Sequence, residues 1–359
     1  MRYYIGSEAR LRRAVEDTAM SVFDGWSYEE VVTPSVDYYS LFEHGMGHAE
    51  AHRAFRFTDT DGQLLALRPD VTSSVARAAA TLLSEQARPL RLCYAAPVFR
   101  QQQQSHAEWR RESTQLGCEL VGKNGASADF EVLAIAAEIL SRLGLQDKCR
   151  VTINSIEIFN GIAEGLKLNV EARERMRGLI DTRDARELQQ FLSAYATSER
   201  ERTEFAQLTQ LTGKGEILSR ARLVITNERS AAALDDLEAL WQPIERLGLQ
   251  DSFDIDLGDV SELDYYTGLI FKVFIHGAGA RVGRGGRYDR LIGNFGGNEP
   301  AIGFILDLDA LTDVLARASA PAVSDSVDEV SEIAAGELSA TFLKARAARA
   351  EGKRVKVQL

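Results

Sequence analysis

One stretch of the chain combines carboxylates and aromatic rings without any basic residue. Residues 254–268 read DIDLGDVSELDYYTG, which holds five acidic residues and two adjacent tyrosines, Tyr265 and Tyr266. This local charge would repel a phosphate, whereas it would tolerate a small amine. The stretch by itself is therefore compatible with a small amine as a ligand, and the rest of the chain has to decide.

A second candidate site lies in the segment QLGCELVG, which alternates polar residues with small or apolar ones as a strand does. Gln115 and Glu119 are four residues apart, so on a strand their side chains point to the same face. A carboxylate beside an amide can hold an ammonium group or an imidazole N–H. The alternative is an exposed polar strand face that binds nothing.

Arginines mark two candidate sites for an anion. The segment ARVGRGGRYDRL places arginines among glycines, at positions Arg281, Arg284, Arg287 and Arg290. Glycine lets backbone N–H groups approach an anion and arginine adds charge, but a glycine-permitted turn whose arginines pair with nearby acids is an equal alternative. The second group comprises Arg100, at the end of an expected strand, and Arg110 and Arg111, which follow a polar loop.

The histidines do not predict a metal site. His44, His48 and His52 recur at helical spacing, but two glycines lie among them and favour a polar loop over a helix. No Ser–His–Asp or Cys–His arrangement follows from the sequence, and the GxGxxG and Walker fingerprints are absent. We therefore expect no metal, no cofactor and no catalytic residue.

The composition is that of an ordinary globular protein of 359 residues, with 45% hydrophobic residues and a net charge of −11. An acidic surface argues against broad binding to nucleic acids. The three cysteines show no CxxC spacing and indicate reduced thiols, as in the cytosol. No signal-peptide core and no apolar run of about 20 residues occurs, so we expect a cytoplasmic protein that does not contact a membrane.

Strand patterns arrive as hairpins and meanders, whereas helical patterns gather in blocks, which favours an α+β fold with an antiparallel sheet. A hairpin is expected over residues 53–69 with its turn at Asp61 and Gly62, and strands are expected over 90–100, 115–122, 269–276, 301–308 and 353–359. Residues 156–247 read as a helical insertion, and the small and acidic residues 318–335 read as a linker. A glycine-rich turn is expected between the strands at 269–276 and 301–308.

Taken in order, these segments resemble the catalytic core of histidyl-tRNA synthetase, a class II aminoacyl-tRNA synthetase. VVTPSVDYYSLF resembles motif 1, the dimerisation element, and LRPDVTSSVAR resembles the family's LRPE-x-T element. YAAPVFR with RRESTQLGCELVG resembles motif 2, LDYYTG resembles the histidine-specific signature, and GGRYDRL with PAIGFILDLDAL resembles the run into motif 3. The resemblance covers about residues 7–317 and implies an antiparallel sheet flanked by helices.

The chain departs from the synthetase where that enzyme activates its amino acid. Ser261 and Glu262 replace the Arg-Gly that opens the signature, Ala310 replaces the arginine of motif 3, and Gln102 or Gln103 replaces an acidic residue of motif 2. Losing a positioned cation from such a transition state costs ~10²–10⁵ in rate. The resemblance therefore implies a protein that does not form an adenylate.

The positions that match amino-acid contacts are retained. By resemblance, Asp70, Thr72 and Gln115 would face the α-amino group of histidine, and Glu119, Tyr265 and Tyr266 would surround its imidazole. A histidine pocket without activating arginines resembles the regulatory subunits of ATP phosphoribosyltransferase. That family implies a non-catalytic subunit that joins short-form catalytic subunits and lets histidine inhibit the first step of histidine biosynthesis. Arg100, Arg111 and Arg287 are kept as candidates for an anion site.

The resemblance also implies a domain plan and partners. Residues 1–317 would form the synthetase-like core, 318–335 a linker, and 336–359 a short helix–strand tail that is too small for the family's full anticodon-binding domain. Self-association through the motif 1-like segment is expected, and tRNA binding is not. Two alternatives stay open, namely a truncated histidyl-tRNA synthetase and a stand-alone histidine sensor.

Overall fold

The protein is built around one large sheet. The computed structural model describes residues 3–101, 110–195, 199–260, 265–318, 329–332, 338–353 and 355–358. Within these ranges the sheet has nine strands, in the order β1 (Glu29–Glu30), β5 (Leu90–Phe99), β6 (Glu112–Val121), β12 (Ala301–Asp307), β11 (Arg281–Arg287), β10 (Leu269–Ile275), β7 (Cys149–Ser155), β9 (Phe253–Asp256) and β8 (Thr212–Gly213). Neighbours are antiparallel except β1 with β5 and β7 with β9, so the predicted antiparallel sheet is confirmed for its central strands.

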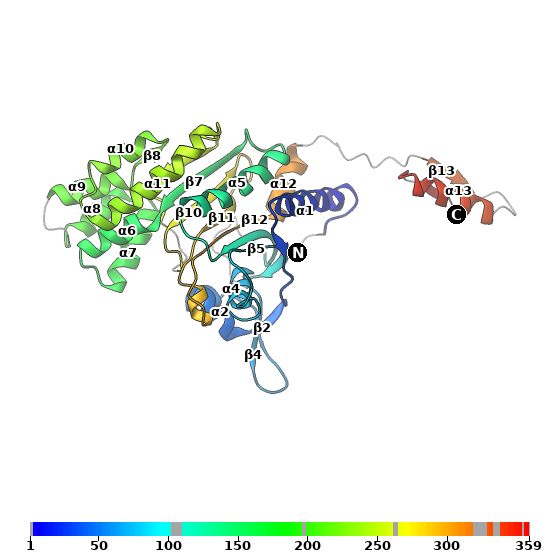
Figure 1. Cartoon of the computed structure of the whole chain (residues 1–359), viewed down its shortest axis with the longest axis horizontal. Coiled ribbons are helices and arrows are strands. Elements are labelled where there is room, and N and C mark those ends of the chain that lie inside the picture. Colours follow the sequence, from blue (N-terminus) through cyan, green and yellow to red (C-terminus); the bar gives the residue numbers. More distant parts are fainter. Residues whose placement is uncertain are drawn as a thin grey trace.

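Alternation along the central strands separates a core face from a site face. On β6, Leu116, Cys118 and Leu120 belong to the main hydrophobic core, whereas Gln115 and Glu119 point to the opposite face because side chains alternate along a strand. The core face is covered by α1 (Ser7–Gly25), α5 (Ala126–Arg142), α11 (Glu228–Arg246) and α12 (Leu308–Ala318). Figure 1 shows α1 beside α12 along this layer.

The site face carries a smaller core. Helix α4 (Thr72–Ala80) and the 3₁₀ turn η1 (Ile292–Phe295) pack together over the sheet. Val75, Tyr94, Tyr288 and Ile292 belong to the same buried cluster on this face. The candidate site lies beside this cluster, so its walls are parts of packed elements.

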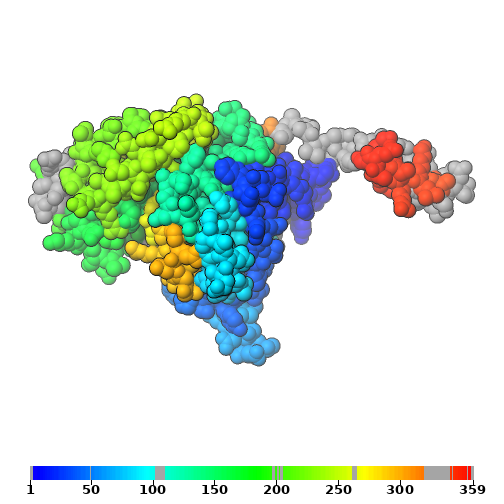
Figure 2. Space-filling model, in the orientation of Figure 1, coloured from blue at the N-terminus to red at the C-terminus, as the bar shows by residue number. Residues whose placement is uncertain are grey.

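A three-stranded sheet projects from this end of the molecule, at the bottom of Figures 1 and 2. It consists of β2 (Val36–Tyr38), β4 (Leu64–Leu67) and β3 (Arg56–Thr58), all antiparallel. The β3–β4 hairpin confirms the predicted turn, in which Gly62 has a φ of 79° that an L side chain rarely adopts.

The loop predicted around the histidines is wrong, because His44 lies in α2 (Tyr39–Met46) and His48 begins α3 (His48–Ala51). The two helices are separate because Gly47, which lies between them, has a φ of 81°, outside the helical region. Helix α2 itself contains Gly45, and the burial of Leu41, Phe42 and Met46 outweighs the weak helix propensity of that glycine.

The prediction of a single glycine-rich turn between the strands expected at 269–276 and 301–308 is also wrong. Residues 281–287 instead form β11, paired with β10 and β12. A Cβ at Gly285 would lie 2.5 Å from the Phe271 ring, and one at Gly286 would lie 2.7 Å from the Tyr266 ring. Glycine is needed here because neighbouring side chains lie flat across the strand.

Among the described residues of the region expected to be a helical insertion, helices predominate and the strand β8 interrupts them. The region contains α6 (Ile156–Gly165), α7 (Val170–Asp181), α8 (Ala185–Leu192), α9 (Glu199–Leu208), α10 (Glu216–Arg222) and α11. These helices gather at one end of the sheet in Figure 1.

The C-terminal segment adds one further unit. Strand β13 (Glu329–Glu332) lies within the expected linker and pairs in parallel with β14 (Val355–Gln358), and α13 (Leu338–Ala350) connects the two. Ala345, Ala348 and Val355 form a small hydrophobic cluster of their own. The domain boundaries themselves stay predictions. Among the described helices, none is long and apolar enough to cross a membrane.

Candidate functional site

The six residues expected to contact histidine all line one small pocket on the site face of the sheet. Asp70 lies two residues before α4 and Thr72 begins it, Gln115 and Glu119 come from β6, and Tyr265 and Tyr266 come from the segment before β10. The remaining lining residues are Arg284, Tyr288, Gly303, Phe304 and Ile305. Among the six expected residues, the structure therefore brings together side chains that are up to 196 positions apart, from Asp70 to Tyr266.

Glu119 is the buried centre of this pocket and is only 1% exposed. Its Oε1 accepts hydrogen bonds from the hydroxyls of Thr72 and Tyr94, both at 2.9 Å, and its Oε2 accepts one from the Tyr288 hydroxyl. Burial raises the pKa of Glu119 to about 7, although these three donors favour the ionised form. The pocket thus holds a carboxyl group poised between its two protonation states at neutral pH.

Two glycines make room for this hydrogen-bond network. A side chain at Gly303, opposite Glu119 across β6 and β12, would overlap the Glu119 carboxylate. A Cβ at Gly117 would lie 2.6 Å from the Tyr94 hydroxyl, so its absence lets that ring lie against the sheet. The carboxylate and the phenol can therefore meet directly above the backbone.

A second acidic side chain of the pocket, Asp70, lies just before the N-terminus of α4. Asp70 is buried and accepts a hydrogen bond from the Ser73 backbone N–H at 3.2 Å. Burial raises the pKa of Asp70, whereas the hydrogen bonds from Ser73 and the charges of Arg100 and Arg284 lower it. Gln115 is also buried, and its Oε1 has no hydrogen-bond donor among the described residues. A buried amide oxygen without a donor is costly unless a ligand supplies one.

The two tyrosines form an aromatic wall. The ring centroids of Tyr265 and Tyr266 are 4.8 Å apart, and Tyr265 meets the Tyr288 ring edge-on at 5.9 Å. The remaining space in the pocket is about 20 Å³. A cavity of this size holds roughly one water molecule, which is less than an imidazole needs.

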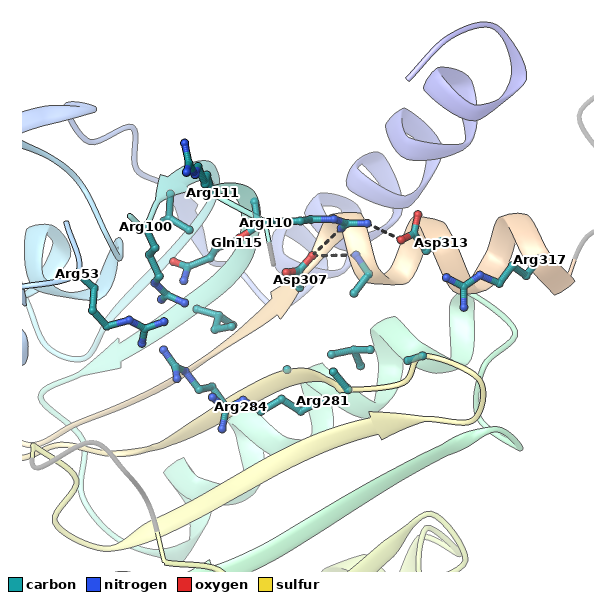
Figure 3. Close-up of a pocket in the computed structure, with 18 residues that line it drawn as sticks. Arg53, Arg100, Arg110, Arg111, Gln115, Arg281, Arg284, Asp307, Asp313 and Arg317 are labelled. Atoms are coloured by element: carbon teal, nitrogen blue, oxygen red, sulfur yellow. Dashed lines mark hydrogen bonds and ion pairs between the residues drawn. The ribbon is translucent and has the colours of Figure 1, made fainter. Parts of the chain in front are cut away.

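A larger cavity of about 180 Å³ adjoins the pocket and shares Gln115, Arg284 and Ile305 with it. Its lining has seven arginines and two carboxylates, comprising Arg53, Arg100, Arg110, Arg111, Arg281, Arg284, Arg317, Asp307 and Asp313. Figure 3 shows the guanidinium groups of Arg53, Arg100 and Arg284 pointing toward one another, while Arg110 turns to the two aspartates. We call this space the arginine cavity.

The three arginines kept as candidates for an anion site do not lie together. Arg100 and Arg111 line the arginine cavity, but Arg287 does not. Arg287 is buried and bonded to Asp129 and, at 3.0 Å, to Asp289. This matches the alternative in which the glycine-rich arginines pair with nearby acids, although Arg281 and Arg284 of the same segment do line the cavity.

Sequence reasoning missed several residues of this region. Tyr94 and Tyr288 were not singled out, although they lie inside the quoted segments YAAPVFR and GGRYDRL. Arg53 and Arg317 gave no sequence signal, because each enters the cavity only through packing.

The structure describes only one of the positions at which the sequence departs from the synthetase pattern. Gln102, Gln103, Ser261 and Glu262 lie outside the described residues. Ala310 lines the arginine cavity, so the short side chain at this position leaves space there.

The neighbouring residue of motif 3 has a structural role. Asp309 accepts hydrogen bonds from Tyr4, Arg12 and the Thr114 backbone N–H, which joins the N-terminal segment to β6. The described part of the chain contains no group of three or more His, Cys, Asp or Glu side chains arranged to hold a metal ion.

Comparisons with known proteins give one consistent family. The family model described as histidyl-tRNA synthetase matches residues 2–311. An ATP phosphoribosyltransferase regulatory subunit of Moorella thermoacetica is 35% identical over 97% of this chain and 88% of its own length. One from Thermoanaerobacter sp. is 30% identical over 99% of this chain and 92% of its own length.

Comparison with solved structures indicates the same fold. A protein of Bacillus halodurans described as an ATP phosphoribosyltransferase regulatory subunit/histidyl-tRNA synthetase superposes with a TM-score of 0.89 at 27% identity, covering 100% of this chain and 91% of that one. A histidyl-tRNA synthetase from Nostoc sp. superposes with a TM-score of 0.82 at 21% identity, covering 100% of this chain and 84% of that one, which supports the fold alone. The chain belongs to the family of ATP phosphoribosyltransferase regulatory subunits, the non-catalytic members of the histidyl-tRNA synthetase-like fold.

Proposed function

We propose that this chain binds histidine in the Glu119 pocket and, through that ligand, inhibits a short-form ATP phosphoribosyltransferase catalytic subunit with which it assembles. The observation that carries the proposal is the convergence of six expected contact residues on one pocket around a buried carboxyl group. The regulatory partnership itself comes from the names of the relatives.

The chemistry of the pocket suits the three polar groups of histidine. Glu119 is an acceptor for an imidazole N–H, and Asp70 with the Gln115 Oε1 can accept from the α-ammonium group. Arg284 is the only cation among the described lining residues, and it suits the carboxylate. An amino acid that lacks an N–H on its side chain would leave Glu119 buried without a new donor, which disfavours it.

Binding requires the pocket to open, which supplies a basis for regulation. The space of about 20 Å³ is smaller than an imidazole, so lining side chains would move when histidine enters, and we assign this movement to the wall formed by Tyr265 and Tyr266. The bound and empty proteins therefore differ in the segment that leads into β10. A ligand shifts an assembly between states when it binds one of them more tightly, and a coupling of ~1–3 kcal/mol is typical.

Self-association is proposed through the three-stranded sheet. Val36, Tyr38 and Phe57 share one face of it, because Tyr38 and Phe57 are both paired with Leu65 on the central strand and Val36 is two residues from Tyr38. These three side chains are 42%, 53% and 42% exposed. An exposed apolar sheet face is a common dimer surface, and two copies would bury it through a symmetric contact.

The test is to mix the purified chain with a short-form catalytic subunit and to measure phosphoribosyl-ATP formation with and without histidine. We expect activity to rise on mixing and to fall when histidine is added. Unchanged activity in both steps would rule the proposal out.

A second assay addresses the two alternatives. Histidine-dependent ATP–pyrophosphate exchange by the chain alone would indicate a synthetase. Histidine binding without any complex with the transferase would indicate a stand-alone sensor.

A further inference from the structure

The wall of the Glu119 pocket rests partly on the core of the helical insertion. The side chain of Tyr266 packs against a hydrophobic cluster that contains Val260 and Ile270. The other buried members of this cluster lie on α6, α7, α8 and α9. None of the described residues of these four helices lines the pocket itself. Because packed side chains transmit displacements, a movement of the insertion reaches Tyr266 without any contact between the insertion and the ligand.

Asp256 attaches the segment that carries the tyrosines to the insertion. We call residues 257–268, which connect β9 to β10, the tyrosine segment. The Oδ1 of Asp256 accepts hydrogen bonds from the Thr212 hydroxyl and from the Gly258 backbone N–H, both at 3.1 Å. Its Oδ2 accepts one from Arg183 Nη2 at 2.5 Å, and Arg183 lies between α7 and α8. A single buried carboxylate therefore holds the start of the tyrosine segment and the insertion together.

The next turn of the tyrosine segment is fixed from two sides. A Cβ at Gly258 would lie 2.2 Å from the Thr209 carbonyl oxygen, so the backbone lies directly against the end of α9. The buried Asp259 forms an ion pair with Lys272 Nζ on β10 at 2.6 Å. Its carbonyl oxygen accepts a hydrogen bond from the Asn154 side chain at 2.8 Å. The insertion, β7 and β10 thus meet at the start of the tyrosine segment.

Arg183 has an unusual backbone conformation for the side chain it carries. Its φ is 52°, in the left-handed region where glycine is the usual residue after a helix. The side chain is 42% exposed, so water would satisfy its charge without Asp256. A strained backbone that presents a half-exposed cation to a buried carboxylate favours a role for this contact beyond the packing of the core.

We propose that Arg183 is a positioning residue that couples the helical insertion to the amino-acid pocket. By holding Asp256 against the insertion, it fixes the support of Tyr266 and thereby sets the affinity of the pocket for histidine. The inference rests on the proposed function, because histidine is taken as the ligand of that pocket. Since binding free energies are reciprocal, histidine in the pocket in turn changes how firmly the insertion is held.

The first experiment measures amide hydrogen exchange of the full chain without any ligand. We expect Arg183→Met to accelerate exchange roughly threefold or more at two places, residues 253–260 and residues 265–275. Lys167→Met is the matched control, because Lys167 is an exposed cation of the same insertion with the same φ of 52°. Unchanged exchange over residues 265–275 would overturn the coupling to Tyr266, whether or not the chain binds histidine.

The second experiment measures the Kd of histidine by calorimetry, together with Tm, in three variants of Arg183. We expect Arg183→Met to raise the Kd about 5–20-fold, and Arg183→Lys, which can still bond to Asp256, to restore it within about twofold. Arg183→Gly removes the contact but relieves the backbone, so it should raise the Kd as Arg183→Met does while having a higher Tm. A Kd that follows Tm across these variants would indicate a merely structural role and overturn the proposal.

A double-mutant cycle tests whether the effect passes through Tyr266. In a Tyr266→Leu background, Arg183→Met should change the Kd of histidine less than about twofold, because the support no longer holds the ring. Independent, additive effects of the two substitutions would overturn this route. If the wild type bound no histidine, the proposed function would fail, while the exchange measurement would still decide whether Arg183 fixes the support of Tyr266.

Discussion

Replacing Glu119 with glutamine should make the empty protein more stable at pH 8 while weakening its affinity for histidine. Glu119 is buried and its pKa is raised from 4.5 to about 7. The folded state therefore holds the proton more tightly than the unfolded state. The contribution of this proton to stability is fully present below about pH 4.5 and is lost as the pH rises through 7.

The size of the effect follows from the shift. The rise in the pKa of Glu119 from 4.5 to about 7 corresponds to about 3 kcal/mol of stability that the ionised wild type lacks. Glutamine keeps the acceptor for Thr72 and Tyr94, but its amide N–H₂ would face the Tyr288 hydroxyl, which must turn and lose its acceptor. That loss costs about 1 kcal/mol, so the variant should gain about 2 kcal/mol at pH 8 and roughly nothing at pH 5.

Thermal unfolding at both pH values measures this difference. We expect Glu119→Gln to raise Tm by roughly 4 °C at pH 8 and to leave it nearly unchanged at pH 5. Glu112→Gln, at an exposed position of the same strand, is the control and should show no pH-dependent shift. A Glu119→Gln variant that is destabilised equally at both pH values would refute the conclusion that burial raises the pKa of Glu119.

The same variant tests the pocket from the ligand side. An imidazole N–H bonded to a neutral amide in place of a carboxylate loses a charge-assisted hydrogen bond, so histidine affinity at pH 8 should fall by about 1–3 kcal/mol. Calorimetry with histidine checks this, and Glu112→Gln again serves as the control. Unchanged affinity would mean that histidine binds elsewhere.

Three further changes test the rest of the reasoning. Phe57→Glu should convert a dimer into a monomer in light scattering, because it places a charge on the apolar face of the three-stranded sheet; an unchanged mass would exclude that face. Gly303→Ala should weaken histidine binding at least tenfold, because the new methyl group would displace the Glu119 carboxylate, and equal affinity would contradict the observed packing. Arg287→Met should lower the free energy of unfolding by about 3 kcal/mol, since it leaves the half-buried Asp129 without its cation, and a urea midpoint equal to that of the wild type would argue against this pair.

Several features of the fold were readable because they depend on local pattern. Alternation along residues 115–122 predicts that Gln115 and Glu119 share a face, and the structure places both in one pocket. The Asp-Gly turn of the β3–β4 hairpin was predicted for the same reason, since its conformation is set by four consecutive residues.

Other features were misread because glycine has more than one structural use. Glycines at 281–287 predicted a turn, but they serve close packing of the Phe271 and Tyr266 rings across β11. The two uses look alike in sequence, since the deciding atoms come from neighbouring strands. The loop expected near His48 failed similarly, because burial of α2 against its neighbours decided the conformation.

The sequence by itself indicated several strands of the large sheet, the family, and the residues that we propose to hold histidine. Only the tertiary structure decided which groups each arginine contacts. Arg284 and Arg287 are three positions apart, yet the first lines the arginine cavity and the second is bonded to Asp129, 158 positions away. Whether a guanidinium meets a carboxylate or other guanidinium groups depends on which distant elements pack beside it, and local sequence contains no record of that packing.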